Sequence, residues 1–257
     1  MSSDSVITAN GGARSSPRRR ARFHLATLLL VLAACATPGP PAPVVPPPAA
    51  RPSKPLPDTA RFASEINAFA HADSVNPPPS NAALFVGSSS IRFWESAATD
   101  FPGLPVINRG FGGSRMDDLL RYADRIVLPY RPRAIVLYEG DNDLQDGRNP
   151  ARIAGDVAEF LALVRTRVPG TRVICLAVKP SPSRWNLVEK MRVTNALLQQ
   201  IVERDTAARF IDVFTPMLGA DGRPRPELFR DDSLHMTRAG YELWTRLVDP
   251  ELRAAMR

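Results

Sequence analysis

Five short aliphatic runs, separated by longer amphipathic stretches, constrain the fold of this 257-residue chain more than any other feature. Turn-forming residues bound each run, as is typical of buried parallel strands. The runs are Ala83–Gly87, Pro105–Asn108, Ala134–Tyr138, Arg172–Val178 and Arg209–Val213. Between them, apolar residues recur at a spacing near 3.6. This spacing predicts helices over Met116–Ile126, Ile153–Val168 and Leu187–Val202.

A further helix is expected around Phe62, Ile66 and Phe69, and a last one after Thr237. Alternation of helices with five strands predicts an α/β fold, a three-layer α/β/α sandwich around a five-stranded parallel sheet. Sites in such sheets form at the carboxyl ends of the strands, so the segments that follow the five runs are where functional residues are expected. Cys175, inside the fourth run, is expected to act as a small buried hydrophobe.

The first 57 residues have a different character. An arginine cluster at 18–22 precedes an apolar stretch over 25–34 and then Cys35. This is the layout of a secretory signal too short to span a bilayer, and the residues before Cys35 are similar to a bacterial lipobox. We expect a lipoprotein signal peptide over 1–34 and lipid on Cys35. The alternative is an ordinary secretory signal in which Cys35 has no role.

A proline-rich segment follows the cysteine. Residues 36–57 contain ten prolines, which favours an extended, semi-rigid spacer. We therefore divide the chain into the signal peptide at 1–34, the lipidated cysteine and linker at 35–57, and a folded domain at 58–257. The expected location is the bacterial cell envelope, with the anchor favoured in the outer membrane and facing the periplasm, because Ala36 lacks the acidic character that favours inner-membrane retention.

The formal charge of +7 does not indicate a nucleic-acid partner. Residues 1–34 hold five arginines against one acid, so the signal region carries more than half of the excess. No basic stripe with interleaved aromatic residues is present in the remainder. The partner that the signal region implies is a membrane, and we expect the protein itself to be a monomer.

Polar residues follow three of the aliphatic runs. Ser88, Ser89 and Ser90 come directly after the first run, where a serine either caps a helix or exposes its hydroxyl. A glycine-rich loop at 110–113 follows the second run and can bring backbone N–H groups close to a ligand. Asn142 follows the third run between Asp141 and Asp143, and the two acids are alternatively metal ligands.

The C-terminal part supplies an acid and a base. His235 follows Asp232 by three positions, so one turn of chain can bring the carboxylate onto Nδ1 and leave Nε2 free. That is the role of the acid in a Ser-His-Asp triad. His71, near the end of the first helix, is expected to be a solvated residue.

In order, spacing and strand context, these segments resemble the four blocks of the SGNH (GDSL-like) hydrolase family. The blocks stand here as Gly87–Ser89, Asn108–Gly113, Gly140–Asp143 and Asp232–His235. The resemblance implies a flavodoxin-like fold, Ser89 as nucleophile, His235 as general base and Asp232 as its orienting acid. It also implies an oxyanion hole built from the N–H of Ser89, the N–H of Gly113 and the side-chain amide of Asn142.

Two positions depart from the family pattern or leave an alternative open. Ser88 replaces the usual aspartate beside the nucleophile, so the support of that turn must differ. Ser90 is the second choice for the nucleophile, and Asp231 the second choice for the acid. Arg184 and Trp185, in the loop after the fourth run, either line the substrate cleft or belong to a rigid proline loop with a packed tryptophan.

The resemblance implies a serine-dependent ester hydrolase that needs no cofactor and no metal. We expect its substrates to be small acyl esters, acetyl esters above all, of carbohydrates or lipids. The alternatives are a lysophospholipase or thioesterase with the same mechanism, a non-catalytic ligand-binding lipoprotein on the same fold, and a metal-dependent phosphoesterase that uses Asp141 and Asp143. A chelator would inhibit only the last of these.

Overall fold

A computed structural model describes residues 61–257, and the segments assigned above to a signal peptide and linker lie outside them. The sheet has five parallel strands in the order β2-β1-β3-β4-β5. The strands are β1 (Ala83–Gly87), β2 (Val106–Gly110), β3 (Ala134–Tyr138), β4 (Arg172–Leu176) and β5 (Ala208–Ile211). This is the doubly wound order of flavodoxin-like folds, and the predicted α/β/α sandwich is confirmed.

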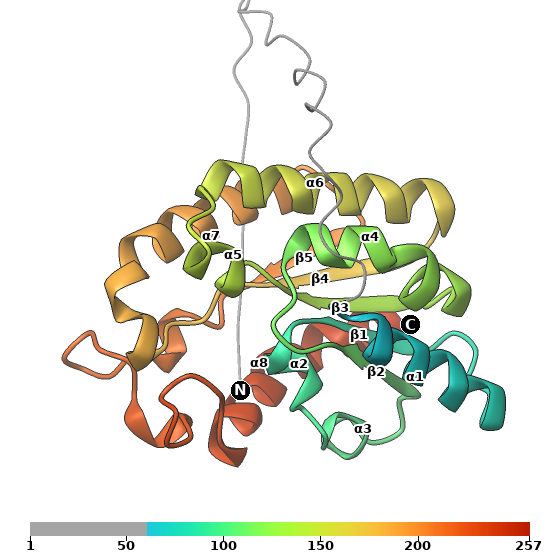
Figure 1. Cartoon of the computed structure of the whole chain (residues 1–257), viewed down its shortest axis with the longest axis horizontal. Coiled ribbons are helices and arrows are strands. Elements are labelled where there is room, and N and C mark those ends of the chain that lie inside the picture. Colours follow the sequence, from blue (N-terminus) through green and yellow to red (C-terminus); the bar gives the residue numbers. More distant parts are fainter. Residues whose placement is uncertain (1–60) are drawn as a thin grey trace, which may run out of the picture. The chain divides into compact units, whose positions relative to one another are not determined.

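Helices cover both faces of the sheet (Figure 1). On one side lie α4 (Met116–Ile126), α6 (Pro150–Arg167) and α7 (Val188–Val202), with α1 (Ala63–Val75) packed against α4. On the other side lies α8 (Arg238–Met256), which contacts β3, β4 and β5. The short helices α2 (Ser89–Arg92), α3 (Ala97–Asp100) and α5 (Asp141–Gln145) belong to the turns that follow the strands.

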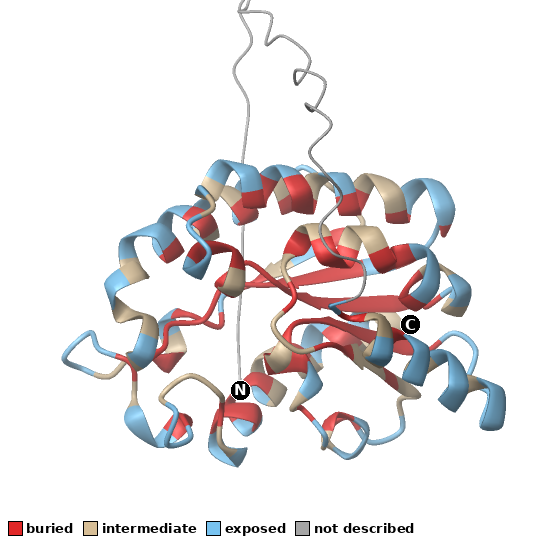
Figure 2. Cartoon of the chain, in the orientation of Figure 1, coloured by how far each residue is buried: buried red, intermediate tan, exposed pale blue. Residues whose placement is uncertain are grey.

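The core lies between these layers, and Figure 2 shows the buried residues along the sheet and on the inward faces of the helices. Every residue of β1 and β3 is buried, as expected for strands covered on both faces. Aromatic rings fill the space between the sheet and α8: Trp94 contacts Trp244 at 5.9 Å between centroids, and Trp244 contacts Tyr138 at 5.0 Å. Burial raises the pKa of Cys175 in β4 to about 12, in keeping with its expected role as a small hydrophobe.

Three strand boundaries differ from the sequence-based expectation for local reasons. β4 ends at Leu176 because the side chain of Asn195 takes both backbone groups of Val178, accepting from its N–H at 2.7 Å and donating to its carbonyl at 3.0 Å. β5 ends at Ile211 because the chain turns there: Asp212 Oδ1 accepts hydrogen bonds from the backbone N–H groups of Phe214 and Thr215. β2 continues to Gly110, which pairs with Gly87.

The order of the strands fixes where a site can form. From β1 the chain crosses to β2 on one side and later to β3 on the other, so the loops after β1 and β3 diverge at the sheet edge. Ligands of open α/β sheets bind in the crevice at such a switch point. Within residues 61–257, no helix has the length and apolar character needed to cross a membrane.

Candidate active site

Ser89 is presented by a turn that only glycine permits. Gly87, at the end of β1, has φ of +140°, and a Cβ there would lie 2.0 Å from the carbonyl oxygen of Tyr138 on β3. The chain therefore turns sharply and begins α2 at Ser89, whose side chain is partly exposed between the buried residues Ser88 and Ser90.

A hydrogen-bonded chain joins Ser89 to residues near the other end of the sequence. His235 Nε2 lies 2.9 Å from Ser89 Oγ, and His235 Nδ1 lies 2.6 Å from Asp232 Oδ2. Asp232 can only accept when ionised, so Nδ1 carries the proton and Nε2 faces the serine as an acceptor. Of the serines and acids that the sequence left open, His235 contacts Ser89 and Asp232 through its two ring nitrogens.

Asp232 is held in its ionised form by several donors. Its Oδ1 accepts from the backbone N–H groups of Leu234 and His235, both at 2.9 Å. Desolvation opposes ionisation, but the side chain of His235 and these two N–H groups outweigh it and lower the pKa of Asp232 to about 2. The carboxylate is thus charged throughout the pH range in which an imidazole changes its protonation.

The loop that carries His235 is braced on several sides. The His235 carbonyl accepts from Arg230 N–H at 2.7 Å, and the ring of His235 meets Phe93 edge-on at 4.8 Å between centroids. Tyr241, on α8, donates its hydroxyl to the carbonyl of Ser90 at 3.0 Å. These contacts fix the histidine loop against the turn that carries Ser89. The position of Phe93, at the end of α2, gave no signal in the sequence.

The glycine loop after β2 leaves one N–H free. Gly112 N–H donates to Glu65 Oε2 at 3.0 Å, and the Gly113 carbonyl accepts from Arg61 Nη2 at 3.1 Å. Gly113 has φ of +71°, a backbone conformation that favours glycine. Across residues 61–257, neither Gly113 N–H nor Ser89 N–H donates to another protein group.

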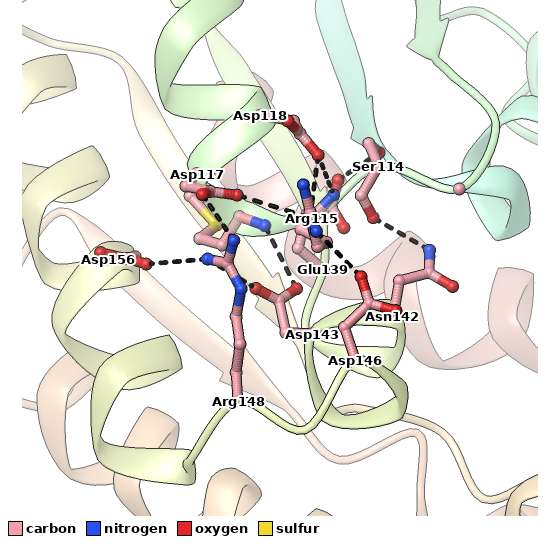
Figure 3. A network of polar contacts seen from close by, with 12 residues as sticks. Ser114, Arg115, Asp117, Asp118, Glu139, Asn142, Asp143, Asp146, Arg148 and Asp156 are labelled. Atoms are coloured by element: carbon pink, nitrogen blue, oxygen red, sulfur yellow. Dashed lines mark hydrogen bonds and ion pairs between the residues drawn. The ribbon is translucent and has the colours of Figure 1, made fainter. Parts of the chain in front are cut away.

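Asn142, the third expected donor, lies in the first turn of α5, close to the carboxyl end of β3. Its Nδ2 donates to the Ser114 carbonyl at 2.9 Å, and its Oδ1 accepts from Arg184 Nη2 at 3.0 Å (Figure 3 shows the contact with Ser114). An amide nitrogen carries two hydrogens, so one remains for a ligand. The structure thus brings all of these donors to the loops at the switch point.

Arg184 and Trp185 lie on the same side of the sheet but in different surroundings. The guanidinium of Arg184 is largely buried, 2.7 Å from Asp141 Oδ1, and Lys179 Nζ lies 2.9 Å from Asp141 Oδ2. Despite desolvation, Lys179 and Arg184 lower the pKa of Asp141. Trp185 is partly exposed, with the guanidinium of Arg223 at 5.1 Å from its ring centroid. Whether either residue touches a substrate stays a prediction.

Two further acids at this edge are buried, and of these the sequence interpretation singled out only Asp143. Glu139 follows β3 directly and is buried, and desolvation raises its pKa well above the usual range. Asp143 accepts from Met116 N–H at 3.2 Å, and desolvation, only partly offset by Arg148, raises the pKa of its carboxyl to about 7. An acid placed immediately after a wholly apolar strand was the one available signal for Glu139.

The carboxylates of this region do not form a metal-binding cluster. Asp141 is already paired with two cations, and across the part of the chain that the structure describes no group of three or more histidine, cysteine or acidic side chains is arranged to hold a metal ion. The arrangement at the switch point is instead a hydrogen-bonded chain of Ser89, His235 and Asp232 beside N–H groups of the loops after β1, β2 and β3.

Comparison with known proteins identifies the family of this chain. The model of the GDSL-like lipase/acylhydrolase family matches residues 79–243, which is more than half of the chain. The platelet-activating factor acetylhydrolase IB subunit alpha2 of Homo sapiens and that of Rattus norvegicus are each 27% identical to this chain over 164 residues, covering 62% of this chain and 70% of theirs.

Solved structures share the fold at lower identity. A GDSL-like lipase from Bacteroides thetaiotaomicron superposes with a TM-score of 0.62 at 22% identity, covering 74% of this chain and 98% of its own. An acetyl-xylooligosaccharide esterase from Geobacillus Stearmophilus superposes with a TM-score of 0.56 at 16% identity, covering 68% and 95%. The family model matches more than half of the chain, and the four blocks meet at the switch point of a fold that these structures share. This chain therefore belongs to the GDSL-like lipase/acylhydrolase family.

Proposed function

We propose that this chain hydrolyses small acyl esters, acetyl esters above all, with Ser89 as nucleophile. The observation that carries the proposal is the hydrogen-bonded chain from Ser89 through His235 to Asp232, with distances of 2.9 and 2.6 Å. A serine hydroxyl needs an adjacent base to attack at neutral pH, and the base needs a fixed tautomer. Both conditions are met here.

The geometry supports the following sequence of steps. Ser89 Oγ attacks the ester carbonyl carbon while its proton passes to His235 Nε2, and Asp232 stabilises the resulting imidazolium. The negative charge on the carbonyl oxygen is bound by Ser89 N–H, Gly113 N–H and the free hydrogen of Asn142 Nδ2. His235 then protonates the departing alcohol, and a water molecule repeats the sequence to release the acid. Each preorganised donor to the oxyanion contributes roughly 10²–10³ in rate.

The preference for acetyl groups is supported by the names of two relatives. One is a platelet-activating factor acetylhydrolase subunit and the other an acetyl-xylooligosaccharide esterase. One name points to a lipid and the other to a carbohydrate, so the alcohol part of the substrate stays open between these two classes. We propose further that lipid on Cys35 anchors the enzyme in the cell envelope, at the outer membrane and facing the periplasm.

The test compares the purified full-length chain with its Ser89→Ala, His235→Ala and Asp232→Asn variants on p-nitrophenyl acetate, butyrate and octanoate. We expect turnover that falls with chain length and resists excess chelator. Each variant should keep its fold by circular dichroism and lose at least about 10³-fold in kcat.

Other outcomes would separate the alternatives. A preference for octanoate would indicate a lysophospholipase or thioesterase. Equal background rates in all four folded proteins would overturn the esterase proposal and favour a ligand-binding lipoprotein. Loss of activity with chelator, but not with Ser89→Ala, would indicate a metal-dependent hydrolase, and p-nitrophenyl phosphate would then test the phosphoesterase alternative.

A further inference from the structure

The carboxyl group of Glu139 lies in the interior beside the proposed oxyanion site, and the mechanism above does not use it. Glu139 is 3% exposed and follows the last residue of β3. Its Oε1 lies 2.6 Å from Ser114 Oγ, in the network drawn in Figure 3. Its Oε2 is buried and has no hydrogen-bond partner among residues 61–257. A buried oxygen without a partner is costly, which calls for an explanation.

A count of hydrogens shows which form of Glu139 fits. Ser114 Oγ also lies 3.1 Å from the carbonyl oxygen of Phe111, which can only accept. A serine hydroxyl holds a single hydrogen, so it cannot donate to Phe111 and to an ionised Glu139 at once. A neutral Glu139 supplies the missing hydrogen. Its O–H donates to Ser114 Oγ, and Ser114 donates onward to Phe111.

The surrounding charges favour the same form. Three carboxylates act on Glu139, namely Asp118 on α4 and Asp141 and Asp143 on α5. The neighbouring guanidinium groups, those of Arg115 and Arg148, are paired with other acids. Across residues 61–257, no cation forms an ion pair with Glu139. An ionised Glu139 would therefore be a buried charge among like charges.

Ser114 is the residue through which Glu139 reaches the oxyanion site. Its hydroxyl closes the turn from Phe111, which contains Gly113, and its carbonyl accepts from Asn142 Nδ2 at 2.9 Å. Ser114 thus touches the segments that carry two of the three proposed oxyanion donors. Holding its side chain in one rotamer fixes the positions of both.

We infer that Glu139 is a positioning residue that, as a neutral carboxylic acid, locks Ser114 and thereby holds the Gly113 N–H and the Asn142 amide in place to bind the oxyanion. The inference rests on the proposed function, because it assigns a role at the same site. Its physical content is that preorganised donors lower the barrier only while their positions are fixed.

The test replaces the O–H donor in two ways. Glu139→Gln keeps a donor at the same place and should retain kcat within about threefold. Glu139→Met removes the donor and should lower kcat by about 10- to 100-fold with KM changed less than about threefold, because only transition-state binding is lost. Ser114→Ala should lower kcat to a similar degree, and Glu139→Met should cost little more when combined with it.

Asp156→Asn serves as the matched control. Asp156 is another buried acid of the network in Figure 3, where its contact is with Arg148 and it lies away from Ser114. It also pairs with Arg152 on its own helix. Its replacement should change the melting temperature without changing kcat. Wild-type kcat in a folded Glu139→Met variant would overturn the inference, as would a Gln variant as impaired as the Met variant.

A second measurement needs no activity and so separates this inference from the proposed function. The infrared difference between wild type and Glu139→Gln at pH 8.5, above the pKa of about 7 of Asp143, should contain the C=O stretch of a neutral carboxylic acid. An ionised-carboxylate band in its place would overturn the inference even if the esterase activity is established. If the Ser89→Ala and His235→Ala variants both kept wild-type activity, the proposed function would instead be wrong.

Discussion

At the residue scale, the orientation of the Asn142 side-chain amide is fixed by the hydrogen bonds of its oxygen and of its nitrogen. Arg184 Nη2 donates to Oδ1 at 3.0 Å, while Nδ2 donates to the Ser114 carbonyl at 2.9 Å. A rotation of the amide by half a turn would place donor against donor and acceptor against acceptor. The orientation that presents an N–H to the site is therefore imposed by both neighbours, and Arg184 is the one whose side chain can be changed.

Replacing Arg184 with methionine is expected to lower kcat by about tenfold and leave KM nearly unchanged, since a misoriented donor weakens transition-state binding. The check is a double-mutant cycle on p-nitrophenyl acetate with Asn142→Ala. The effect of Arg184→Met should largely disappear when the amide is already absent.

Arg192→Met is the control for this cycle, because Arg192 lies on α7 over the ring of Phe214. Its replacement should leave kcat unaltered. Fully additive losses in the cycle would show that Arg184 acts on the substrate itself, as a cleft residue would, rather than through Asn142.

At the scale of elements, α4 and α5 meet through the carboxylate of Asp143. Its Oδ2 accepts from the first N–H of α4 at 3.2 Å, while Arg148 approaches its Oδ1 only to 3.7 Å. Desolvation raises the pKa of this acid to about 7. The folded state thus prefers the neutral form, whereas the unfolded chain ionises near pH 4.

This difference makes the stability of the fold depend on pH. The contribution of Asp143 is fully present below about pH 4 and is lost as the pH rises to about 7, which amounts to at most about 4 kcal/mol. Asp143→Asn, which keeps an acceptor and cannot ionise, should therefore gain stability relative to wild type between pH 5 and pH 8. Urea unfolding of both proteins at pH 5 and at pH 8 measures this difference in the free energy of unfolding.

The control is Asp205→Asn, which alters an acid that precedes β5, at the other end of the strands, and pairs with Arg165 on α6. It should shift stability equally at both pH values. A difference between wild type and Asp143→Asn that does not change with pH would contradict the assigned pKa.

The sequence predicted the correct boundaries for those elements whose ends are marked by residues next to them in the chain. β1, β3 and α4 begin and end where expected, because apolar residues and turn residues mark both of their ends. β4 was expected to run two residues further, and no local signal shows that Asn195 captures Val178 from a distance of 17 residues. Tertiary contacts of this kind decide where a strand stops.

The candidate site divides in the same way. The Asp232–His235 contact spans three residues, so spacing alone anticipates it, and the four blocks place Ser89, Gly113 and Asn142 at one edge of the sheet. Glu139 was missed because its function depends on burial beneath the glycine loop, which residue type does not reveal. The contact of Arg184 with Asn142 was not foreseen, because the two residues lie 42 positions apart.

At the scale of the whole molecule, the topology joins parts of the chain that lie far apart in sequence. The switch point between β1 and β3 presents Ser89, and the loop before α8 returns His235 to it from 146 residues away. All of these residues belong to the part of the chain that the structure describes. The proposed anchor at Cys35 is separated from them by the proline-rich segment 36–57, so anchoring and catalysis should be separable.

Cys35→Ala is therefore expected to move the protein from the membrane fraction to the soluble periplasmic fraction of a Gram-negative host without altering kcat. Stable anchoring requires more than one acyl chain, which the diacylglyceryl group expected on Cys35 supplies. Cell fractionation, together with mass spectrometry of the mature N-terminal peptide, checks both the location and the added lipid.

Cys175→Ala is the matched control, because it removes the buried cysteine of β4 and should leave the protein in the membrane fraction. A Cys35→Ala variant that remains with membranes would mean that another part of the chain binds them. Wild-type protein found in the soluble fraction, with an unmodified N-terminus, would instead favour the ordinary secretory signal. In either case kcat on p-nitrophenyl acetate should be the same, because the residues proposed to carry the reaction all lie after Gly87.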